Sequence, residues 1–242
     1  IWTPIGNESN KYTGTFDGQN HTISGLYFND DNAENVGLFG YISYGTIKNI
    51  GITNSYLKGK KRVGSVCGYS DSDDYRGSQI INCYNSASTV SGSNDYIGGI
   101  CGYNYKSTIK NNYNTGTVSG SSRIGGICGY NRGKIENCYN TGDIKATFSD
   151  AGGICGHSNG EIYNCYNTGT ISGDGYAGGI CGNIGENLIH FCYNAGKVSG
   201  STAIGGICGR IYDTGTVSNC YYSNEICSVG GINGNDISGQ AE

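Results

Sequence analysis

Cysteine is the residue type in this 242-residue chain with the widest chemical capacity, because thiols can pair, bind metals or attack carbon. Of the twelve cysteines, ten fall into neighbouring pairs that a disulfide could join: Cys67–Cys83, Cys128–Cys138, Cys155–Cys165, Cys181–Cys192 and Cys208–Cys220. Cys101 lacks such a partner because Asn112 stands in that place, and Cys227 is extra. No two cysteines have the short spacing typical of a thiolate metal site. We expect free thiols that act as small buried hydrophobic residues; disulfides within the pairs, and less so a metal site, are the alternatives.

The other chemically capable residues do not form a catalytic motif. The acidic run Asp71–Asp74 could attract calcium, but it lacks the glycine and the distant glutamate of an EF-hand loop, so we predict a solvated loop. His21, His157 and His190 are scattered, and no zinc-protease, serine-hydrolase or phosphate-loop motif is present. We therefore predict no catalytic residue, no metal site and no cofactor, and that the chain is not an enzyme.

Composition predicts strands rather than helices. The chain has 44 Gly, 28 Ile and 8 Val but only 4 Leu and no Met, and β-branched residues suit a pleated surface. The net charge of −4, with 15 basic residues, leaves no basic stripe for nucleic acid. No apolar run approaches the ~20 residues of a membrane span. The first residues, which begin at Ile1, do not resemble a signal peptide, and we expect a piece excised from a longer protein.

Internal repetition is the strongest signal in the sequence. The segment IGGICGYN begins at both Ile97 and Ile124, and variants of it begin at Val63, Ala151, Ala177 and Ile204. Its cysteines lie at positions 67, 101, 128, 155, 181 and 208, which gives one step of 34 residues and then steps of 26 or 27. A second segment of the type N-C-Y-N and a third of the type T-V-S-G follow each copy. A fixed period of this length indicates a repeat architecture.

A unit of about 27 residues with three short β-like stretches cannot bury its own apolar side chains, so identical units must stack. We predict one all-β domain over residues 1–242, a parallel β-solenoid of the right-handed β-helix type with about eight coils. Residues 1–35 would form an N-terminal cap and an irregular first coil, 36–222 the regular coils, and 223–242 a C-terminal cap. Like residues would stack in ladders at ~4.8 Å, which is too far for disulfides between stacked cysteines. We place Asn85, Asn114, Asn140, Asn167 and Asn194 at left-handed corners.

Tyrosine supplies the candidate ligand surface. One predicted ladder contains Tyr84, Tyr113, Tyr139, Tyr166, Tyr193 and Tyr221, and part of another contains Tyr41, Tyr69, Tyr103 and Tyr130. An exposed column could bind sugars or protein, whereas a merely structural column would stabilise the stack through cross-strand contacts. Alternation along I-x-N-C-Y does not decide which face the tyrosines take.

The motif GGICGYN, followed by I-x-N-C-Y-N-x-G-x-[IV]-S-G, resembles the GLUG repeat, and TFDGQNHTISGLYF from Thr15 resembles the opening coil that often precedes it. Cysteine stands where that family often has valine. GLUG repeats occur in large secreted or surface-attached bacterial proteins and beside the catalytic part of some IgA1-specific metalloendopeptidases. The resemblance implies a non-catalytic extracellular module of a bacterial cell-surface protein, adhesin-like or a spacer, whose partner would be a host or matrix glycan or protein. A carbohydrate-active β-helix enzyme, or its glycan-binding accessory module, is the alternative.

Overall fold

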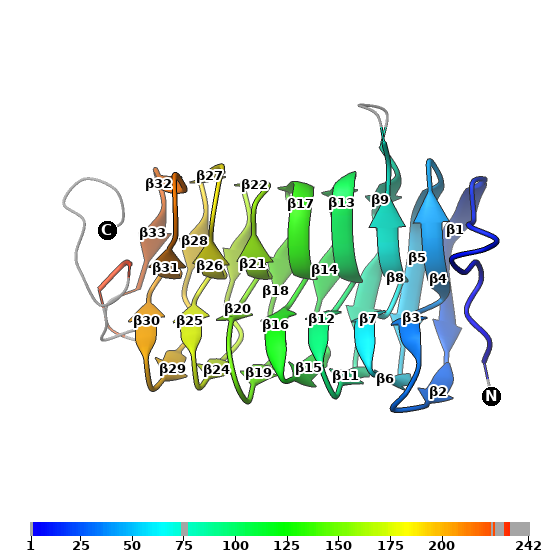
Figure 1. Ribbon diagram of the computed structural model, residues 1–242, viewed down its shortest axis with the longest axis horizontal. Coiled ribbons are helices and arrows are strands. Elements are labelled where there is room, and N and C mark those ends of the chain that lie inside the picture. The colour runs from blue at the N-terminus through cyan, green and yellow to red at the C-terminus, as the bar shows by residue number, and fades with distance from the viewer. Residues whose placement is uncertain (1, 74–76, 224, 226–229, 233–242) are drawn as a thin grey trace.

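The computed structural model describes residues 2–73, 77–223, 225 and 230–232. In these residues the chain is an all-β parallel solenoid in which each strand pairs in parallel with its copy one coil further on. Figure 1 shows the coils stacked side by side along the long axis, with β1 (Thr15–Ser24) near one end of the rod and β33 (Tyr221–Tyr222) near the other. Within the described part, no helical segment has the length and hydropathy that a membrane span needs. The predicted fold class is therefore confirmed, with about eight coils.

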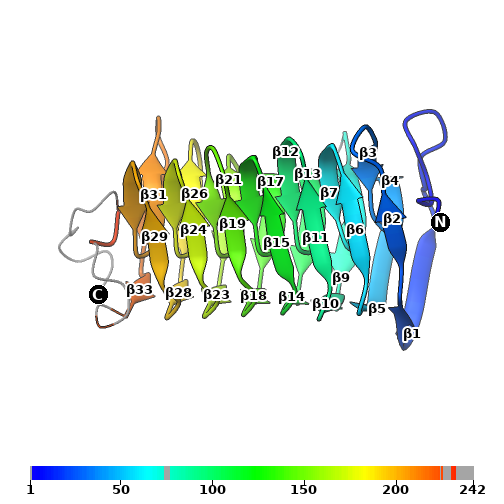
Figure 2. The same cartoon turned by 90° about the horizontal axis from the view of Figure 1, so that it is seen from below.

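Among the described residues, two sheets of seven strands and one of nineteen make up the wall. The first small sheet contains β2 (Tyr27–Asn29), β6 (Tyr56–Gly59), β11 (Thr89–Gly92), β15 (Thr117–Gly120), β19 (Ile144–Ala146), β24 (Ile171–Gly173) and β29 (Val198–Gly200). The second contains β3 (Glu34–Val36), β7 (Lys61–Gly64), β12 (Asp95–Gly98), β16 (Ser122–Gly125), β20 (Ala151–Gly152), β25 (Tyr176–Gly178) and β30 (Ala203–Gly205). Figure 2 shows the first of these sheets from its outer side.

The large sheet consists of three rows of strands that each coil visits in turn. Row 1 contains β4 (Phe39–Ser43), β8 (Cys67–Asp71), β13 (Cys101–Lys110), β17 (Cys128–Glu136), β21 (Cys155–Ser158), β26 (Cys181–Ile184) and β31 (Cys208–Ile211). Row 2 contains β1 (Thr15–Ser24), β5 (Thr46–Thr53), β9 (Gln79–Ile81), β22 (Glu161–Tyr163), β27 (Leu188–His190) and β32 (Thr216–Ser218), and the second halves of β13 and β17 join it. Row 3 contains β10 (Tyr84–Ser86), β14 (Tyr113–Asn114), β18 (Tyr139–Asn140), β23 (Tyr166–Asn167), β28 (Tyr193–Asn194) and β33 (Tyr221–Tyr222).

The core is a narrow column of stacked identical side chains. Ile100, Ile127 and Ile154 follow one another through successive coils and are fully buried, as are Ile109 and Ile135 on the next row. Because one coil supplies only a few apolar side chains, each ladder gains its buried contacts from the coils above and below. The repeat of the sequence is thus the repeat of the core.

The N-terminal segment lies against β4. Ile5 and Tyr12 form isolated parallel bridges with Phe39 and Ile42, and the Trp2 indole N–H donates a hydrogen bond to the Gly37 carbonyl at 3.1 Å. Most of the predicted C-terminal cap, residues 223–242, lies outside the described residues. The division into two caps and a regular middle remains a prediction.

The left-handed corners differ from those that we expected. The asparagines that we placed at the corners are buried and do not have positive φ: Asn85, Asn114, Asn140, Asn167 and Asn194. The left-handed residues are the asparagines three positions earlier, Asn82, Asn111, Asn137 and Asn164. The corner precedes the buried cysteine of N-C-Y-N, so the first asparagine of the motif turns the chain while the second is buried and hydrogen-bonded.

Candidate functional site: aromatic ladders and a charged pocket

The six tyrosines that we predicted as a ligand surface do form one column, on row 3 of the large sheet. Consecutive members pair in exact register along the strands. The rings face solvent, and exposure rises toward the C-terminal end, from half-buried at Tyr84 to 41% at Tyr166 and 53% at Tyr221. The tyrosines of N-C-Y-N therefore point outward and the cysteines inward, which settles the question of the face.

The rings of this column stack on one another. The ring centroids of Tyr84 and Tyr113 are 4.8 Å apart, and the ring planes differ by 1°. In the next two pairs, Tyr113–Tyr139 and Tyr139–Tyr166, the centroids are 4.9 Å apart and the planes differ by 5°. A ring in the middle of the column thus has another ring over each face, so its edge and hydroxyl are what it presents to solvent. Such stacking supplies cross-strand stabilisation. The ligand role of the column stays a prediction.

The second tyrosine ladder, on row 1, has a different geometry. Tyr69–Tyr103 and Tyr103–Tyr130 have centroids 4.9 Å apart, but their planes are inclined by 77° and 54°. His157 continues this ladder in the next coil. These rings are half-buried, and burial raises the pKa of the Tyr103 hydroxyl to about 12. The inclined rings leave room for side chains from the neighbouring sheet.

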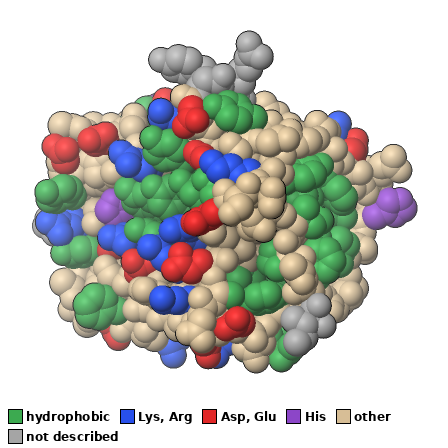
Figure 3. All heavy atoms as spheres, turned by 45° about the vertical axis from the view of Figure 1, so that its right-hand side comes forward, with side chains coloured by type: hydrophobic (Ala, Val, Ile, Leu, Met, Phe, Trp, Pro, Cys, Tyr) green, Lys and Arg blue, Asp and Glu red, His purple; other side chains and the backbone are tan. Residues whose placement is uncertain are grey.

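Arginines from the second small sheet lie over this ladder. The Arg62 guanidinium is 5.3 Å from the Tyr69 ring centre, and Arg123 is 6.0 Å from that of Tyr130, both within the range of cation–π contact. In both pairs the tyrosine follows the arginine by seven residues. Figure 3 shows apolar side chains gathered on this side of the molecule, with both basic and acidic side chains around them.

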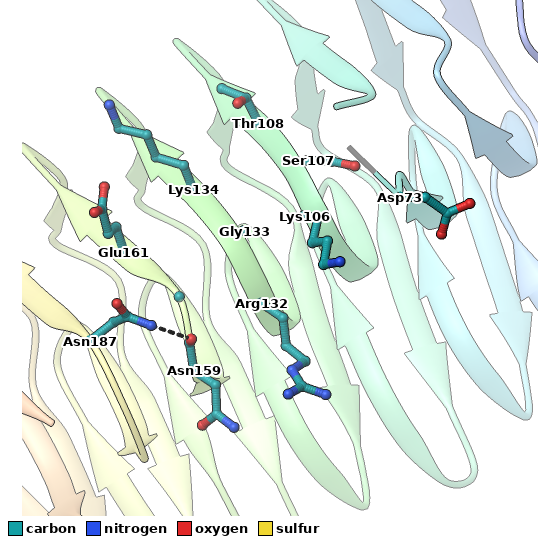
Figure 4. Close-up of a pocket in the computed structure, with 11 residues that line it drawn as sticks. Asp73, Lys106, Ser107, Thr108, Arg132, Gly133, Lys134, Asn159, Glu161 and Asn187 are labelled. Carbon is teal, nitrogen blue, oxygen red and sulfur yellow. Dashed lines mark hydrogen bonds between the residues drawn. The ribbon is translucent and has the colours of Figure 1, made fainter. Parts of the chain in front are cut away.

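A pocket of about 450 Å³ lies where the chain turns from row 1 to row 2. Its lining combines three cations and two carboxylates with hydroxyls, amides and glycine backbone: Lys106, Arg132, Lys134, Asp73, Glu161, Ser107, Thr108, Asn159, Asn187, Gly133 and Gly160. Figure 4 shows that these residues come from successive coils, with Asp73 on the loop that follows β8. A volume of this size is within the range of pockets that bind small molecules.

Ion pairs beside the pocket hold some of these charges. Lys134 and Lys110 both contact Glu136, at 2.5 and 2.6 Å, and their hydrogen bonds lower the pKa of Glu136. Lys106 and Arg132 make no ion pair with a described carboxylate. Both instead lie over the Tyr105 ring, with the Lys106 nitrogen 5.3 Å and the Arg132 guanidinium 5.8 Å from its centre.

The pocket was not predicted from the sequence. The corner between rows 1 and 2 is where the repeat is least constant in length and residue type. It supplies four of the lining residues: Lys106, Arg132, Asn159 and Asn187. The available signal was the spacing between the first and second motifs, which is one residue longer in the coil of Cys101 than in the coil of Cys128.

The cysteines form two internal ladders. All eleven described cysteines are free thiols and are buried, so none of the five candidate disulfides is formed; Cys227 lies outside the described residues. Burial raises the pKa of the Cys83 thiol to about 12, which keeps it protonated. In the ladder formed by the cysteines of N-C-Y-N, Asn112 stands where the neighbouring coils have cysteine. It accepts a hydrogen bond from the Cys83 N–H at 2.6 Å and donates one to the Ile80 carbonyl at 2.8 Å.

The acidic loop after β8 is partly described. Asp71 is buried, accepts a hydrogen bond from the Tyr41 hydroxyl at 2.9 Å and contacts Lys11 at 3.4 Å, so it anchors the N-terminal segment. Asp74 lies outside the described residues. Among those that are described, no three His, Cys, Asp or Glu side chains gather as they would around a metal ion.

Comparison with known proteins identifies the repeat. The family model described as the GLUG motif matches residues 93–119, 120–145 and 149–172. These three segments match the GLUG repeat. The matched segments cover the coils around β13, β17 and β21, where the sequence motifs are most regular, and the resemblance inferred from sequence is confirmed.

Relatives of these GLUG repeats are much longer proteins. A stretch of 101 residues, 41% of this chain, is 38% identical to the protein named halomucin from Haloquadratum walsbyi but spans 1% of it. A stretch of 57 residues, 23% of this chain, is 33% identical to a protein named "Putative Gly-rich membrane protein" from Evansella cellulosilytica and spans 7% of it.

A solved structure shares the fold. The protein described as "a putative immunoglobulin A1 protease from Bacteroides ovatus" superimposes with a TM-score of 0.52 over 93% of this chain and 66% of its own length. The two sequences are 22% identical, so the likeness concerns the architecture of the solenoid.

Proposed function

We propose that this chain is a non-catalytic, extracellular module of a bacterial cell-surface protein, which acts as a stiff spacer or as an adhesive surface. The observation that carries the proposal is the register of the stack. Tyrosines pair coil by coil along row 3 from β10 to β33, and isoleucines pair along row 2 from Ile47 to Ile189. Such a rod projects its lateral loops at fixed positions and offers a protease few open segments. The membrane-protein name of one relative supports a surface location.

Surface accessibility tests this location directly. An antibody raised against the 242-residue chain is applied to intact cells that make the full-length parent protein, and to lysed cells as a matched sample. We expect the antibody to bind intact cells as strongly as it binds lysed cells. Binding that appears only after lysis would contradict the proposal.

Deletion of one coil separates the spacer from the adhesive role. Removing residues 128–154 joins Ile127 to Cys155, which restores the natural Ile–Cys step and keeps the ladders in register. A spacer should keep its function with a rod that is shorter by about 5 Å. An adhesive surface that uses Tyr130 and Arg132 should lose attachment to its partner.

The pocket at the turn between rows 1 and 2 favours a second candidate, a glycan-binding accessory module. It combines carboxylates with lysine and arginine side chains on one lateral face, as recognition of sugar hydroxyls and charges requires. A glycan array tests this role. Binding that falls with Arg132→Gln supports the pocket, and binding that falls with Tyr193→Ala supports the row 3 column. Release of reducing ends from a bound polysaccharide would instead support the enzyme alternative.

A further inference from the structure

The register of the solenoid shifts at a β-bulge in β13. The register pairs Tyr105 with Arg132 and then Thr108 with Lys134, so that Lys106 and Ser107 on β13 face Gly133 alone on β17. Lys106 adopts a left-handed conformation with φ of 49°, which is uncommon for lysine. Bulges re-aim side chains and are concentrated beside functional sites. Here the bulge turns Lys106 toward the pocket that it lines with Arg132.

The charges in the pocket are unbalanced in a chain that is acidic overall. Lys106, Arg132 and Lys134 line it against two described carboxylates, Asp73 and Glu161, whereas the whole chain has a net charge of −4. Lys106 and Arg132 have no described carboxylate partner, and both lie against the ring of Tyr105. The two cations lining the pocket next to one another are thus available to an anion from outside.

The polar groups around these cations are held in fixed positions. The Asn159 side chain donates to the Tyr130 hydroxyl at 3.3 Å and faces His157 Nε2 at 3.3 Å. The Asn187 amide donates to the Asn159 carbonyl at 2.7 Å, as Figure 4 shows. The pocket therefore offers a pre-organised rim, which reduces the entropic cost of binding a flexible ligand.

We infer that this pocket binds a carboxylate-bearing sugar, a hexuronate unit of an acidic glycan. The planar Arg132 fork matches a carboxylate, and Lys106 adds a second positive charge. Thr108 and Glu161 also line the pocket and offer a hydroxyl and a carboxylate to sugar hydroxyls, whereas the Ser107 hydroxyl already donates to the Tyr105 carbonyl at 2.9 Å. The lining residues come from successive coils, so the pocket runs along the stacking direction of the rod. This inference rests on the glycan-binding candidate above and names its ligand chemistry.

Titration of the 242-residue chain with a galacturonate tetramer, monitored by calorimetry, tests the inference. The control ligand is the methyl ester of the same tetramer, which keeps the sugar and removes the charge. We expect the acid to bind at least about tenfold more tightly than the ester, with an affinity that falls as salt is added. Equal affinities for acid and ester, or no binding of the acid, would overturn it.

Two pocket variants and one matched control locate the binding. Arg132→Gln and Lys106→Asn each remove one positive charge, and asparagine tolerates the left-handed backbone at position 106. Lys145→Gln removes the same charge from β19, an exposed site on another sheet. We expect about tenfold weaker binding of the acid for each pocket variant and no change for Lys145→Gln, with thermal melting confirming that all three fold. An equal loss for Lys145→Gln, or none for either pocket variant, would overturn the assignment.

The glycan array separates failure of this inference from failure of the glycan-binding candidate. If the chain binds neutral glycans on the array as tightly as acidic ones, the inference on hexuronates fails and the glycan-binding candidate stands. If it binds no glycan at all, both fail.

Discussion

The side-chain amide of Asn114 donates a hydrogen bond to Oδ1 of Asn140 at 2.7 Å, and both residues are fully buried in the wall of the solenoid. The side-chain amide of Asn140 donates in turn to Oδ1 of Asn167 at 2.8 Å, and it also donates to the Gly142 carbonyl at 2.8 Å. Buried polar groups are costly unless they are paired, and this column is paired only when the coils are in register. The ladder therefore selects one stacking register among the several that repeated isoleucines alone would permit.

Substitution of Asn140 by leucine tests this claim. Leucine removes the acceptor of Asn114 and the donor to Asn167, and each loses a partner inside the wall. We expect Asn140→Leu to lower the free energy of unfolding by about 2–3 kcal/mol, measured by urea denaturation. Asn94→Leu, an exposed site, is the control and should change it by less than about 0.5 kcal/mol. Equal effects at the two sites would argue against a role for the ladder.

The left-handed corner at Asn137 supports a second prediction. Its φ is 54°, a conformation that glycine adopts freely and alanine does not. Asn137→Gly and Asn137→Ala both remove the hydrogen bonds to Asn111 and Asn164, so the comparison isolates the backbone. We expect the alanine variant to be about 1 kcal/mol less stable than the glycine variant in urea denaturation. At Asn140, which is not left-handed, alanine should be at least as stable as glycine; the same order at both positions would contradict this assignment of the corner.

The sequence allowed the solenoid to be predicted because its period is carried by many residues at once. The tyrosine column, the buried cysteines and the isoleucine core all follow from stacking units in register. The corner was misplaced because N-C-Y-N contains two asparagines, and only the path of the chain shows which one turns. The pocket was missed because Lys106 and Arg132 occupy positions that do not repeat, and a bulge of one residue brings Lys106 to it. Periodicity thus predicts what the coils share and says little about where one coil differs.

Alkaline pH should destabilise the chain through its buried thiols. Burial raises the pKa of Cys83 from 9.0 to about 12, so between these values the unfolded chain loses a proton that the folded chain keeps. Stability is therefore fully present below pH 9 and falls as pH rises toward 12, by about 2–3 kcal/mol for this thiol at pH 11. Urea denaturation at pH 8 and pH 11 measures the change. Cys83→Val removes the titrating group and should show a drop that is smaller by that amount; an identical drop would mean that the Cys83 thiol does not contribute.

Asp150 and His157 form a contact that replaces the arginine–tyrosine pair of other coils. The two residues are seven apart, as Arg123 and Tyr130 are, and His157 Nδ1 lies 3.1 Å from the carboxylate of Asp150, whose side chain is 4% exposed. His157→Tyr restores the ladder residue but leaves this buried carboxylate without its ring partner, which costs about 1–3 kcal/mol. Adding Asp150→Ala removes the carboxylate, so we expect the double variant to be more stable than His157→Tyr alone, with a coupling of about 0.5–3 kcal/mol in urea denaturation. The exposed Asp174 provides the control, since Asp174→Ala combined with His157→Tyr should give additive effects. Additivity at Asp150 as well would show that the pair is not coupled.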